Sequence, residues 1–133
     1  MGRKTIDDLL QESRRSLRRL EPAQAHEAVR NGALLIDTRS GDDIAESGRV
    51  PGSVHVPLSV LEWRLDPASE FKDPSIASLD TDVILICAHG YSSSLAGARL
   101  QQLGFRNVAD VVGGYTEWVA AGLPVEAAVE QAP

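Results

Sequence analysis

The sequence contains one cysteine, Cys87, and the residues around it could support nucleophilic chemistry. Cys87 ends an apolar run and is followed by Ala-His-Gly-Tyr-Ser-Ser-Ser, after which the sequence becomes helical in character. Gly90 permits a tight turn, and the first amides of a helix point toward the loop that precedes them. Converging amides form a nest that stabilises an anion such as a thiolate. The pattern therefore favours a reactive thiolate over the buried, inert thiol that a lone cysteine usually is.

The size of the required stabilisation indicates which groups must provide it. A cysteine with an ordinary pKa of about 8.5 is only about 3% thiolate at pH 7. Lowering that pKa by two units takes roughly 2.7 kcal/mol, whereas a helix dipole typically supplies about 0.3–1 kcal/mol. Direct hydrogen bonds to sulfur must supply the remainder, and the hydroxyls of Ser92–Ser94 are candidates besides the amides.

The segment from Val83 to Ala109 contains no Asp or Glu, although the protein is acidic overall. One interpretation is a site kept free of carboxylates so that an anionic substrate can approach. The other is that a buried strand and helix carry few charges in any protein. The sequence leaves both interpretations open.

Composition excludes several classes of protein. A chain of 133 residues suggests one domain, and 13 basic against 19 acidic residues argue against general nucleic-acid binding. One cysteine cannot form an internal disulfide, and the three histidines lack metal-ligand spacing, so we expect no metal or other cofactor. No run approaches a membrane span or a secretory signal, and acidic residues near the N-terminus count against a mitochondrial presequence. We therefore expect a cytoplasmic protein without a membrane partner.

Hydrophobic periodicity and turn residues predict strands that alternate with helices. The predicted helices cover 6–20, with a Thr5–Asp8 capping box, then 22–32, 41–48, 60–66 with Ser59 as its cap, 95–103 and 115–122. The predicted strands cover 33–37, 53–58, 82–87 and 107–112, and residues 67–80 are a predicted loop. This alternation indicates a largely parallel sheet, in which ligand sites gather at the carboxyl ends of the strands. Cys87 and Asp37 both end strands and so lie where chemistry is expected.

Four motifs resemble the single-domain rhodaneses, the thiosulfate sulfurtransferases, in the same order along the chain. "CAHGYSSSLAG" resembles their active-site loop, and "LLIDTRSGDDI" resembles their Asp-x-Arg signature. "GRVPGSVHVPL" resembles the Gly-His-Ile-Pro-Gly-Ala segment, and "GGYTEWVAAGLPV" the closing Gly-Gly-x-x-x-Trp segment. The resemblance implies a three-layer α/β fold with a central, mostly parallel five-stranded sheet and helices on both faces. It implies a rhodanese domain over 22–125, preceded by a helical extension over 1–21 and followed by a flexible tail over 126–133.

The resemblance also implies a mechanism and a set of site residues. Cys87 would attack the outer sulfur of thiosulfate or a related donor and become a persulfide, and cyanide or a thiol would then accept that sulfur. The loop would bind the substrate through Ala88, His89, Gly90, Tyr91, Ser92 and Ser93. Asp37 and Arg39 would brace the loops behind the site rather than react. A monomer or a weak homodimer is expected.

Two side chains near these motifs, Arg64 and His89, have two interpretations each, and three others depart from the family pattern. Arg64 could attract an anionic donor, or it could be a solvated surface arginine. His89 could add positive charge near the thiolate, or it could be a neutral loop residue chosen for shape. Ser92 stands where many rhodaneses have an arginine, a departure that lowers the positive charge near the donor; Arg49 and Ser53 stand where the family often has His and Ala.

Two other functions compete with sulfur transfer. The related fold of dual-specificity phosphatases has a loop one residue longer that ends in an arginine, which neutralises the phosphoryl oxygens. Here that position is Ser93, and the next cation is Arg99, well inside the predicted helix. The other alternative is a non-enzymatic sulfur carrier or interaction module, against which the presence of Cys87 argues.

Overall fold

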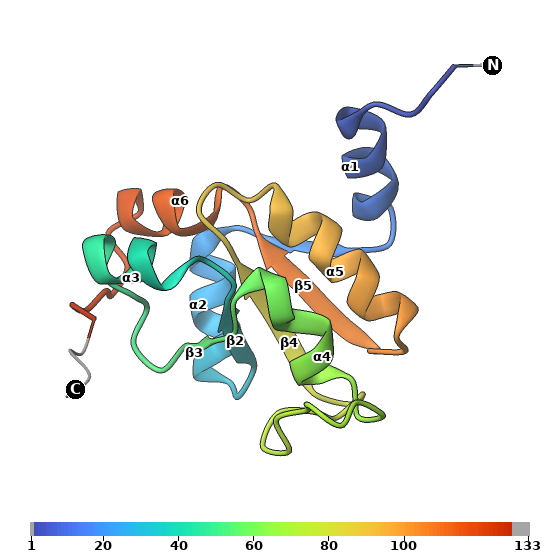
Figure 1. Ribbon diagram of the computed structural model, residues 1–133. Helices are drawn as coiled ribbons and strands as arrows, with labels where there is room; N and C mark the ends of the chain where they lie inside the picture. The colour runs from blue at the N-terminus through green and yellow to red at the C-terminus, as the bar shows by residue number, and fades with distance from the viewer. Residues whose placement is uncertain (1, 129–133) are drawn as a thin grey trace.

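The computed structural model describes residues 2–128 as an α/β protein built on one five-stranded sheet (Figure 1). The strands are β1 (Arg18–Leu20), β2 (Leu34–Asp37), β3 (Val54–His55), β4 (Asp82–Ile86) and β5 (Asn107–Val111). The helices are α1 (Ile6–Arg14), α2 (Pro22–Arg30), α3 (Gly41–Ser47), α4 (Leu61–Leu65), α5 (Ser92–Gln102) and α6 (Gly114–Ala120), with a 3₁₀ turn, η1 (Leu58–Val60). The sheet order is β1-β5-β4-β2-β3, and every neighbouring pair is parallel. The predicted fold class is confirmed.

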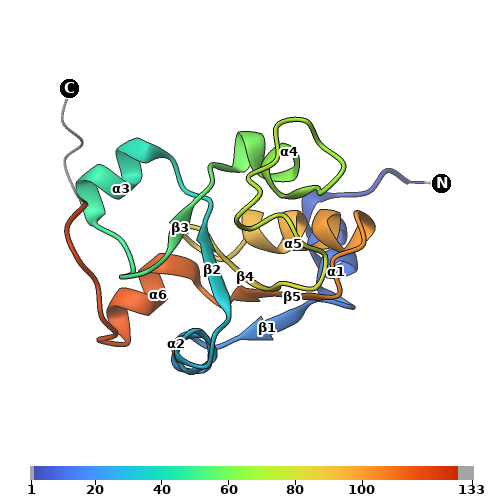
Figure 2. The ribbon, with the colours of Figure 1, turned by 90° about the horizontal axis from the view of Figure 1, so that it is seen from below.

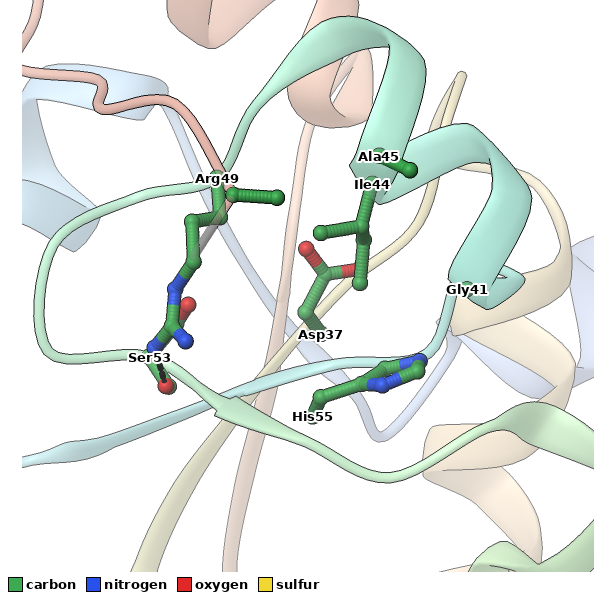
Figure 3. Close-up of a pocket in the computed structure, with 8 residues that line it drawn as sticks. Asp37, Gly41, Ile44, Ala45, Arg49, Ser53 and His55 are labelled. Carbon is green, nitrogen blue, oxygen red and sulfur yellow. Dashed lines mark hydrogen bonds between the residues drawn. The ribbon is translucent and has the colours of Figure 1, made fainter. Parts of the chain in front are cut away.

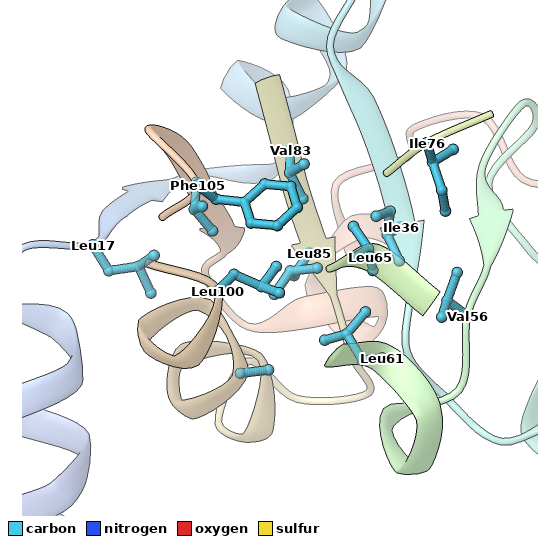
Figure 4. Packing of buried hydrophobic residues seen from close by; sticks show 12 residues of the cluster. Leu17, Ile36, Val56, Leu61, Leu65, Ile76, Val83, Leu85, Leu100 and Phe105 are labelled. Carbon is cyan, nitrogen blue, oxygen red and sulfur yellow. The ribbon is translucent and has the colours of Figure 1, made fainter. Parts of the chain in front are cut away.

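Helices cover both faces of the sheet, as Figure 2 shows for α4 and α5 on one side and α2 on the other. Side chains of β4 alternate between two cores: Val83 and Leu85 pack in the cluster drawn in Figure 4, and Ile84 and Ile86 pack with Trp118 on the opposite face. All four of these β4 residues have no measurable exposure. This burial on both faces explains why the strand reads as an uninterrupted apolar run.

The first predicted helix is wrong in its second half. Its capping box, Thr5 with Asp8, is present, but α1 ends at Arg14, and Arg18–Leu20 form β1 beside β5. Leu17 and Leu20 fit a helical spacing, but they also lie an odd number of residues apart, which places them on opposite faces of an extended chain. Leu17 accordingly packs in the first core and Leu20 against the second. Tertiary pairing with β5 therefore overrides the local helical pattern.

The segment after β2 differs from the expectation in two smaller respects. The predicted strand over 53–58 is reduced to Val54–His55, and Ser59 lies within η1 rather than capping a helix, since α4 begins only at Leu61. Beyond β3 the chain bends across the end of β2, where the Leu58 amide donates to the Thr38 carbonyl at 3.1 Å. The other predicted helices and strands are present, and α5 begins at Ser92 rather than at Leu95. At the end of the chain, Glu126 exchanges backbone hydrogen bonds with Arg49, and residues 129–133 of the predicted tail lie outside the described residues.

Candidate active site: the Cys87 loop

Cys87 lies at the carboxyl end of β4, at the start of a loop that leads directly into α5. Its side chain is buried, with 5% of the residue exposed. Gly90 turns the loop with φ of +82°, a conformation that favours glycine. A Cβ atom at Gly90 would also approach the Gly113 nitrogen to 2.6 Å, so no larger residue fits there without movement of the backbone.

The start of α6 holds the loop on one side through its backbone. Tyr115 donates its amide to the Cys87 carbonyl at 2.8 Å, and Thr116 donates its amide and hydroxyl to the Ala88 carbonyl at 3.1 and 3.0 Å. Gly114 lies so close that a Cβ there would come within 2.8 Å of the Gly90 nitrogen. The glycine pair of the last motif therefore serves as the surface against which the cysteine loop packs.

Hydrogen bonds around Sγ lower the pKa of Cys87 despite its burial. Burial raises the pKa of this thiol, but hydrogen bonds from Ser93, Ser92 and the Gly90 amide outweigh it, so the net shift is downward. The Gly90 nitrogen lies 3.1 Å from Sγ. These are the amide and hydroxyl donors that the sequence indicated, and they favour the thiolate.

The Ser93 hydroxyl has a second potential acceptor that the sequence analysis missed. It lies 2.8 Å from Oδ2 of Asp110, and the Ser94 hydroxyl donates to the same oxygen at 2.8 Å. One hydroxyl carries one proton, so Ser93 cannot donate to Asp110 and to the thiolate at the same time. The thiolate therefore depends chiefly on the Gly90 and Ser93 amides and on the Ser92 hydroxyl. Asp110 is fully buried in β5, and a carboxylate within an apolar strand was the available signal for it.

Two arginines of the N-terminal segment hold the opposite side of the loop. Arg14 Nη2 and Arg19 Nη2 donate to the Gly90 carbonyl at 2.9 and 3.0 Å. Arg19 Nε also pairs with Asp110 at 3.0 Å, and Arg14 Nε donates to the Ser94 hydroxyl at 3.0 Å. The sequence predicted a helix over this segment and did not assign these arginines to the site. No local pattern marks them, because their partners are more than 70 residues away.

Asp37 and Arg39 form a buried ion pair at the end of β2, next to β4 in the sheet. Arg39 Nη2 lies 2.7 Å from Oδ2 of Asp37 and donates to the Gly48 carbonyl at 2.8 Å. The Arg39 guanidinium stands 3.7 Å from the ring centre of Tyr115. Burial raises the pKa of Tyr115, an effect that Arg39 partly opposes. The pair ties the loop after α3 to α6, which is a bracing geometry.

Other predicted residues lie at the edge of this arrangement or away from it. His89 is exposed, and its Nδ1 lies 3.2 Å from the Thr116 hydroxyl. Arg64 donates to the Phe71 carbonyl at 2.9 Å and lies 3.7 Å from Asp73, so its contacts are with the following loop rather than with the cysteine loop.

A cavity of about 410 Å³ lies between α3 and the ends of β2 and β3 (Figure 3). Its lining includes Asp37, Arg49, Ser53 and His55, and residues of the cysteine loop do not line it. Within residues 2–128, no group of three or more His, Cys, Asp or Glu side chains is arranged to hold a metal ion. The same part of the chain has no helix with the length and apolar character that a membrane crossing requires.

Comparison with known proteins places the chain in a family. Residues 21–121 match the rhodanese-like domain. The chain belongs to the rhodanese-like family. A curated relative from Haemophilus influenzae, thiosulfate sulfurtransferase GlpE, is 31% identical over 85% of this chain and 98% of its own. The protein of the same name from Pseudomonas syringae is 36% identical over 76% of this chain and 86% of its own. The family predicted from the four motifs is confirmed.

Solved structures support the same fold. A Rhodopseudomonas palustris protein of unknown function, described as a possible tyrosine phosphatase, matches with a TM-score of 0.86 and 30% identity over 95% of this chain and 97% of that one. The polysulfide-sulfur transferase homodimer of Wolinella succinogenes matches with a TM-score of 0.73 and 23% identity, covering 88% and 83% of the two chains. This second rhodanese-like neighbour is informative about the fold alone.

Proposed function

We propose that this protein is a sulfurtransferase that moves the outer sulfur of thiosulfate, or of a related donor, to an acceptor through a persulfide on Cys87. The observation that carries the proposal is the loop geometry: Cys87 is the one cysteine of the chain, and its Sγ lies 3.1 Å from the Gly90 amide at the start of a helix. Relatives named thiosulfate sulfurtransferase cover most of this chain at 31–36% identity. The enzyme class predicted from the sequence agrees with their names.

The chemistry takes two displacement steps. The Cys87 thiolate attacks the outer sulfur of thiosulfate, the sulfur–sulfur bond of the donor breaks, and sulfite leaves with its electron pair. The product is a Cys87 persulfide, which is anionic at its outer sulfur. An acceptor nucleophile, cyanide or a thiolate, then attacks that outer sulfur, and the Cys87 thiolate is regenerated. One cysteine is sufficient for this cycle because the acceptor comes from outside the protein.

The loop supports both steps. Donors that stabilise the thiolate, the Gly90 and Ser93 amides and the Ser92 hydroxyl, also suit an anionic persulfide. A persulfide places its outer sulfur about 2 Å beyond Sγ. Tyr91, which is 61% exposed, and the exposed His89 lie on the loop at the surface, where an acceptor would arrive.

Intact-mass measurement after thiosulfate treatment tests the proposal. We expect a gain of about 32 Da, one sulfur atom, that is removed by cyanide and absent from Cys87→Ala. In steady state, thiocyanate production should show ping-pong kinetics and be lost in the same variant. An unmodified wild-type mass after treatment with thiosulfate and with polysulfide would overturn the proposal and favour a non-enzymatic interaction module.

A phosphatase activity is a weaker candidate, despite the description of the Rhodopseudomonas palustris neighbour. Phosphoryl transfer needs a cation inside the loop, and the position that would supply it is Ser93. Arg14 and Arg19 reach the loop, but both donate to the Gly90 carbonyl oxygen. They are thus paired with the backbone of the loop and do not replace the missing cation. We expect no Cys87-dependent turnover of para-nitrophenyl phosphate, and clear turnover would reverse the ranking of the two functions.

We also propose an acceptor, a cellular location and an oligomeric state. Cyanide and small thiols suit a persulfide that lies in a short surface loop. A cytoplasmic location agrees with the free thiol of Cys87, because reducing compartments keep thiols in that state. Cell fractionation would test the location, and light scattering would test the expected monomer or weak homodimer.

A further inference from the structure

The Gly90 carbonyl is the one backbone group of the cysteine loop that accepts from two guanidinium groups in the described structure. Arg14 comes from α1 and Arg19 from β1, so both precede the segment 21–121 that matches the family domain. The two Nη2 atoms lie 2.9 and 3.0 Å from the carbonyl oxygen. A peptide oxygen held in this way has little freedom to rotate.

The orientation of that carbonyl determines where the next amide points. The peptide between Gly90 and Tyr91 is trans, as are all described peptides, and its C=O and N–H therefore point in opposite directions. With the oxygen directed at the two arginines, the Tyr91 N–H faces away from them, into the loop. The Gly90 N–H already lies 3.1 Å from Sγ of Cys87. Gly90 therefore joins the peptide that the arginines hold to the N–H that donates to the sulfur.

A flip is a real alternative because glycine accepts many backbone conformations. It would turn the carbonyl oxygen into the loop, so that the negative end of the peptide dipole would face the side on which the thiolate lies. The arginines oppose this, since rotation would break two charge-assisted hydrogen bonds at once.

Each arginine is itself fixed by a second contact. Arg19 pairs with the buried Asp110, its direct neighbour in the β1–β5 register. Arg14 donates to Ser94, and its guanidinium lies 5.8 Å from the Tyr91 ring centre. Leu17, between the two arginines in sequence, packs against Gly97 of α5, where a Cβ would come within 2.7 Å of its side chain. The N-terminal segment is therefore seated on α5 with little freedom to slide.

The surroundings of these arginines argue against direct capture of a donor. They line a cavity of about 360 Å³ whose wall also includes Glu21 and Glu117. Two carboxylates offset the two guanidinium charges, and Cys87 does not line this cavity. The arginines thus act through the Gly90 peptide.

We propose, building on the sulfur-transfer function above, that Arg14 and Arg19 are positioning residues, which hold the Gly90–Tyr91 peptide in one orientation and so keep the adjoining Gly90 N–H on the sulfur of Cys87. The N-terminal segment is in this sense part of the sulfur site.

The test compares Arg14→Gln with Arg15→Gln, which removes the same charge from the next, exposed position. The pH dependence of Cys87 alkylation by iodoacetamide is the readout, because it reports the thiolate without requiring sulfur transfer. We expect alkylation at pH 6 to slow by about tenfold in Arg14→Gln, the factor that corresponds to one lost charge-assisted hydrogen bond. Arg15→Gln should follow the wild-type curve within about twofold.

Arg19 needs a variant that avoids an unpaired buried carboxylate. Arg19→Gln combined with Asp110→Asn removes both charges, and Arg18→Gln, at an exposed ion pair with Asp82, is its control. We expect the double variant to slow alkylation as Arg14→Gln does. Amide spectra give a direct view: the Tyr91 amide proton should shift as Cys87 ionises in the wild type and shift less in Arg14→Gln.

The outcomes separate this proposal from the function on which it rests. If Arg14→Gln and Arg15→Gln give the same alkylation profile and the same Tyr91 shift, the positioning role is refuted even where the 32 Da gain occurs. If the gain fails in the wild type while Arg14→Gln alters both readouts, the sulfur-transfer proposal fails and the positioning of the loop stands.

Discussion

Two neighbouring parallel strands, β2 and β4, have their carboxyl ends side by side, but one end carries a charged pair and the other a free thiol. The end of β2 carries Asp37 and Arg39, which neutralise each other at 2.7 Å and are only 1% and 3% exposed at their side chains. The end of β4 carries Cys87, and among residues 2–128 the groups that lower the pKa of its thiol are amides and hydroxyls rather than a cation. One site has its charges satisfied, and the other is left available for a substrate. Strand-end placement alone therefore does not distinguish bracing from reactivity.

The largest expected change in unfolding free energy is at the Asp37–Arg39 ion pair. Arg39→Met would leave the buried Asp37 carboxylate and the Gly48 carbonyl without their partner and remove the contact with Tyr115. Breaking a buried pair in this way costs about 3–5 kcal/mol of unfolding free energy, against about 0–1 kcal/mol for an exposed pair. Urea unfolding should show this loss for Arg39→Met and almost none for Arg18→Gln, which breaks the exposed pair with Asp82.

Function should respond differently from stability at this position. The proposed bracing role of Arg39 predicts that thiocyanate production per folded molecule stays within about threefold of wild type. Restoring neutrality with Asp37→Asn in the Arg39→Met background should recover part of the stability. A loss of activity as complete as that of Cys87→Ala, in protein shown to be folded, would contradict the assignment of the pair to bracing.

The second prediction concerns pH and addresses the charge on the sulfur. The pKa of Cys87 is lowered by its hydrogen bonds, so the rate of persulfide formation should reach its plateau at a lower pH than it would for an ordinary cysteine. Below that lowered pKa the thiolate fraction falls tenfold for each pH unit, and the rate should fall with it. The sign for stability is the same: a group with a depressed folded pKa stabilises the fold at high pH and loses that contribution as pH falls through the folded pKa. Stopped-flow measurement of sulfite release across pH gives the rate profile, and a rate still rising tenfold per unit above pH 8 would contradict it.

The smallest expected effect is at Arg64. Its hydrogen bond to Phe71 and its partly exposed pair with Asp73 make it part of a surface loop, so the donor-attracting interpretation has no support from its contacts. Arg64→Gln should leave the KM for thiosulfate and the turnover within about twofold of wild type, with a stability change of about 0–1 kcal/mol. A KM that rises severalfold at unchanged turnover would instead identify Arg64 as a donor-binding group.

Local chemistry made much of this structure predictable. The apolar run before Cys87, the glycine turn at Gly90 and the helix that follows are short-range features, and they predicted the strand, the turn and the helix start that bring the Gly90 amide to 3.1 Å from Sγ. The resemblance to the rhodaneses predicted Asp37 and Arg39 as a brace, and the structure joins the two side chains in a buried ion pair. The α/β fold class followed from the alternation of strands and helices along the sequence.

The unpredicted part depends on contacts between distant segments. Arg19 and Asp110 meet because β1 lies beside β5, and β1 itself was hidden by a leucine spacing that suits a helix and a strand equally. The acid-free segment around Cys87 suggested a site without carboxylates. Asp110, however, lies just beyond that segment in sequence, and its carboxylate accepts hydrogen bonds from Ser93 and Ser94 at the start of α5. Spacing along one segment does not reveal such a pairing.

The short outer strands of the sheet have a consequence for solution behaviour. β1 has three residues and β3 has two, so each edge offers few free backbone groups to another chain. Exposed edges are templates for strand addition and aggregation, and short or charged ones resist it. Arg18 adds a charge on one edge, and Pro57 follows β3 on the other and lacks an amide to donate. The protein is thus protected against growth into fibrillar assemblies through its sheet edges, and it should tolerate high concentration during purification.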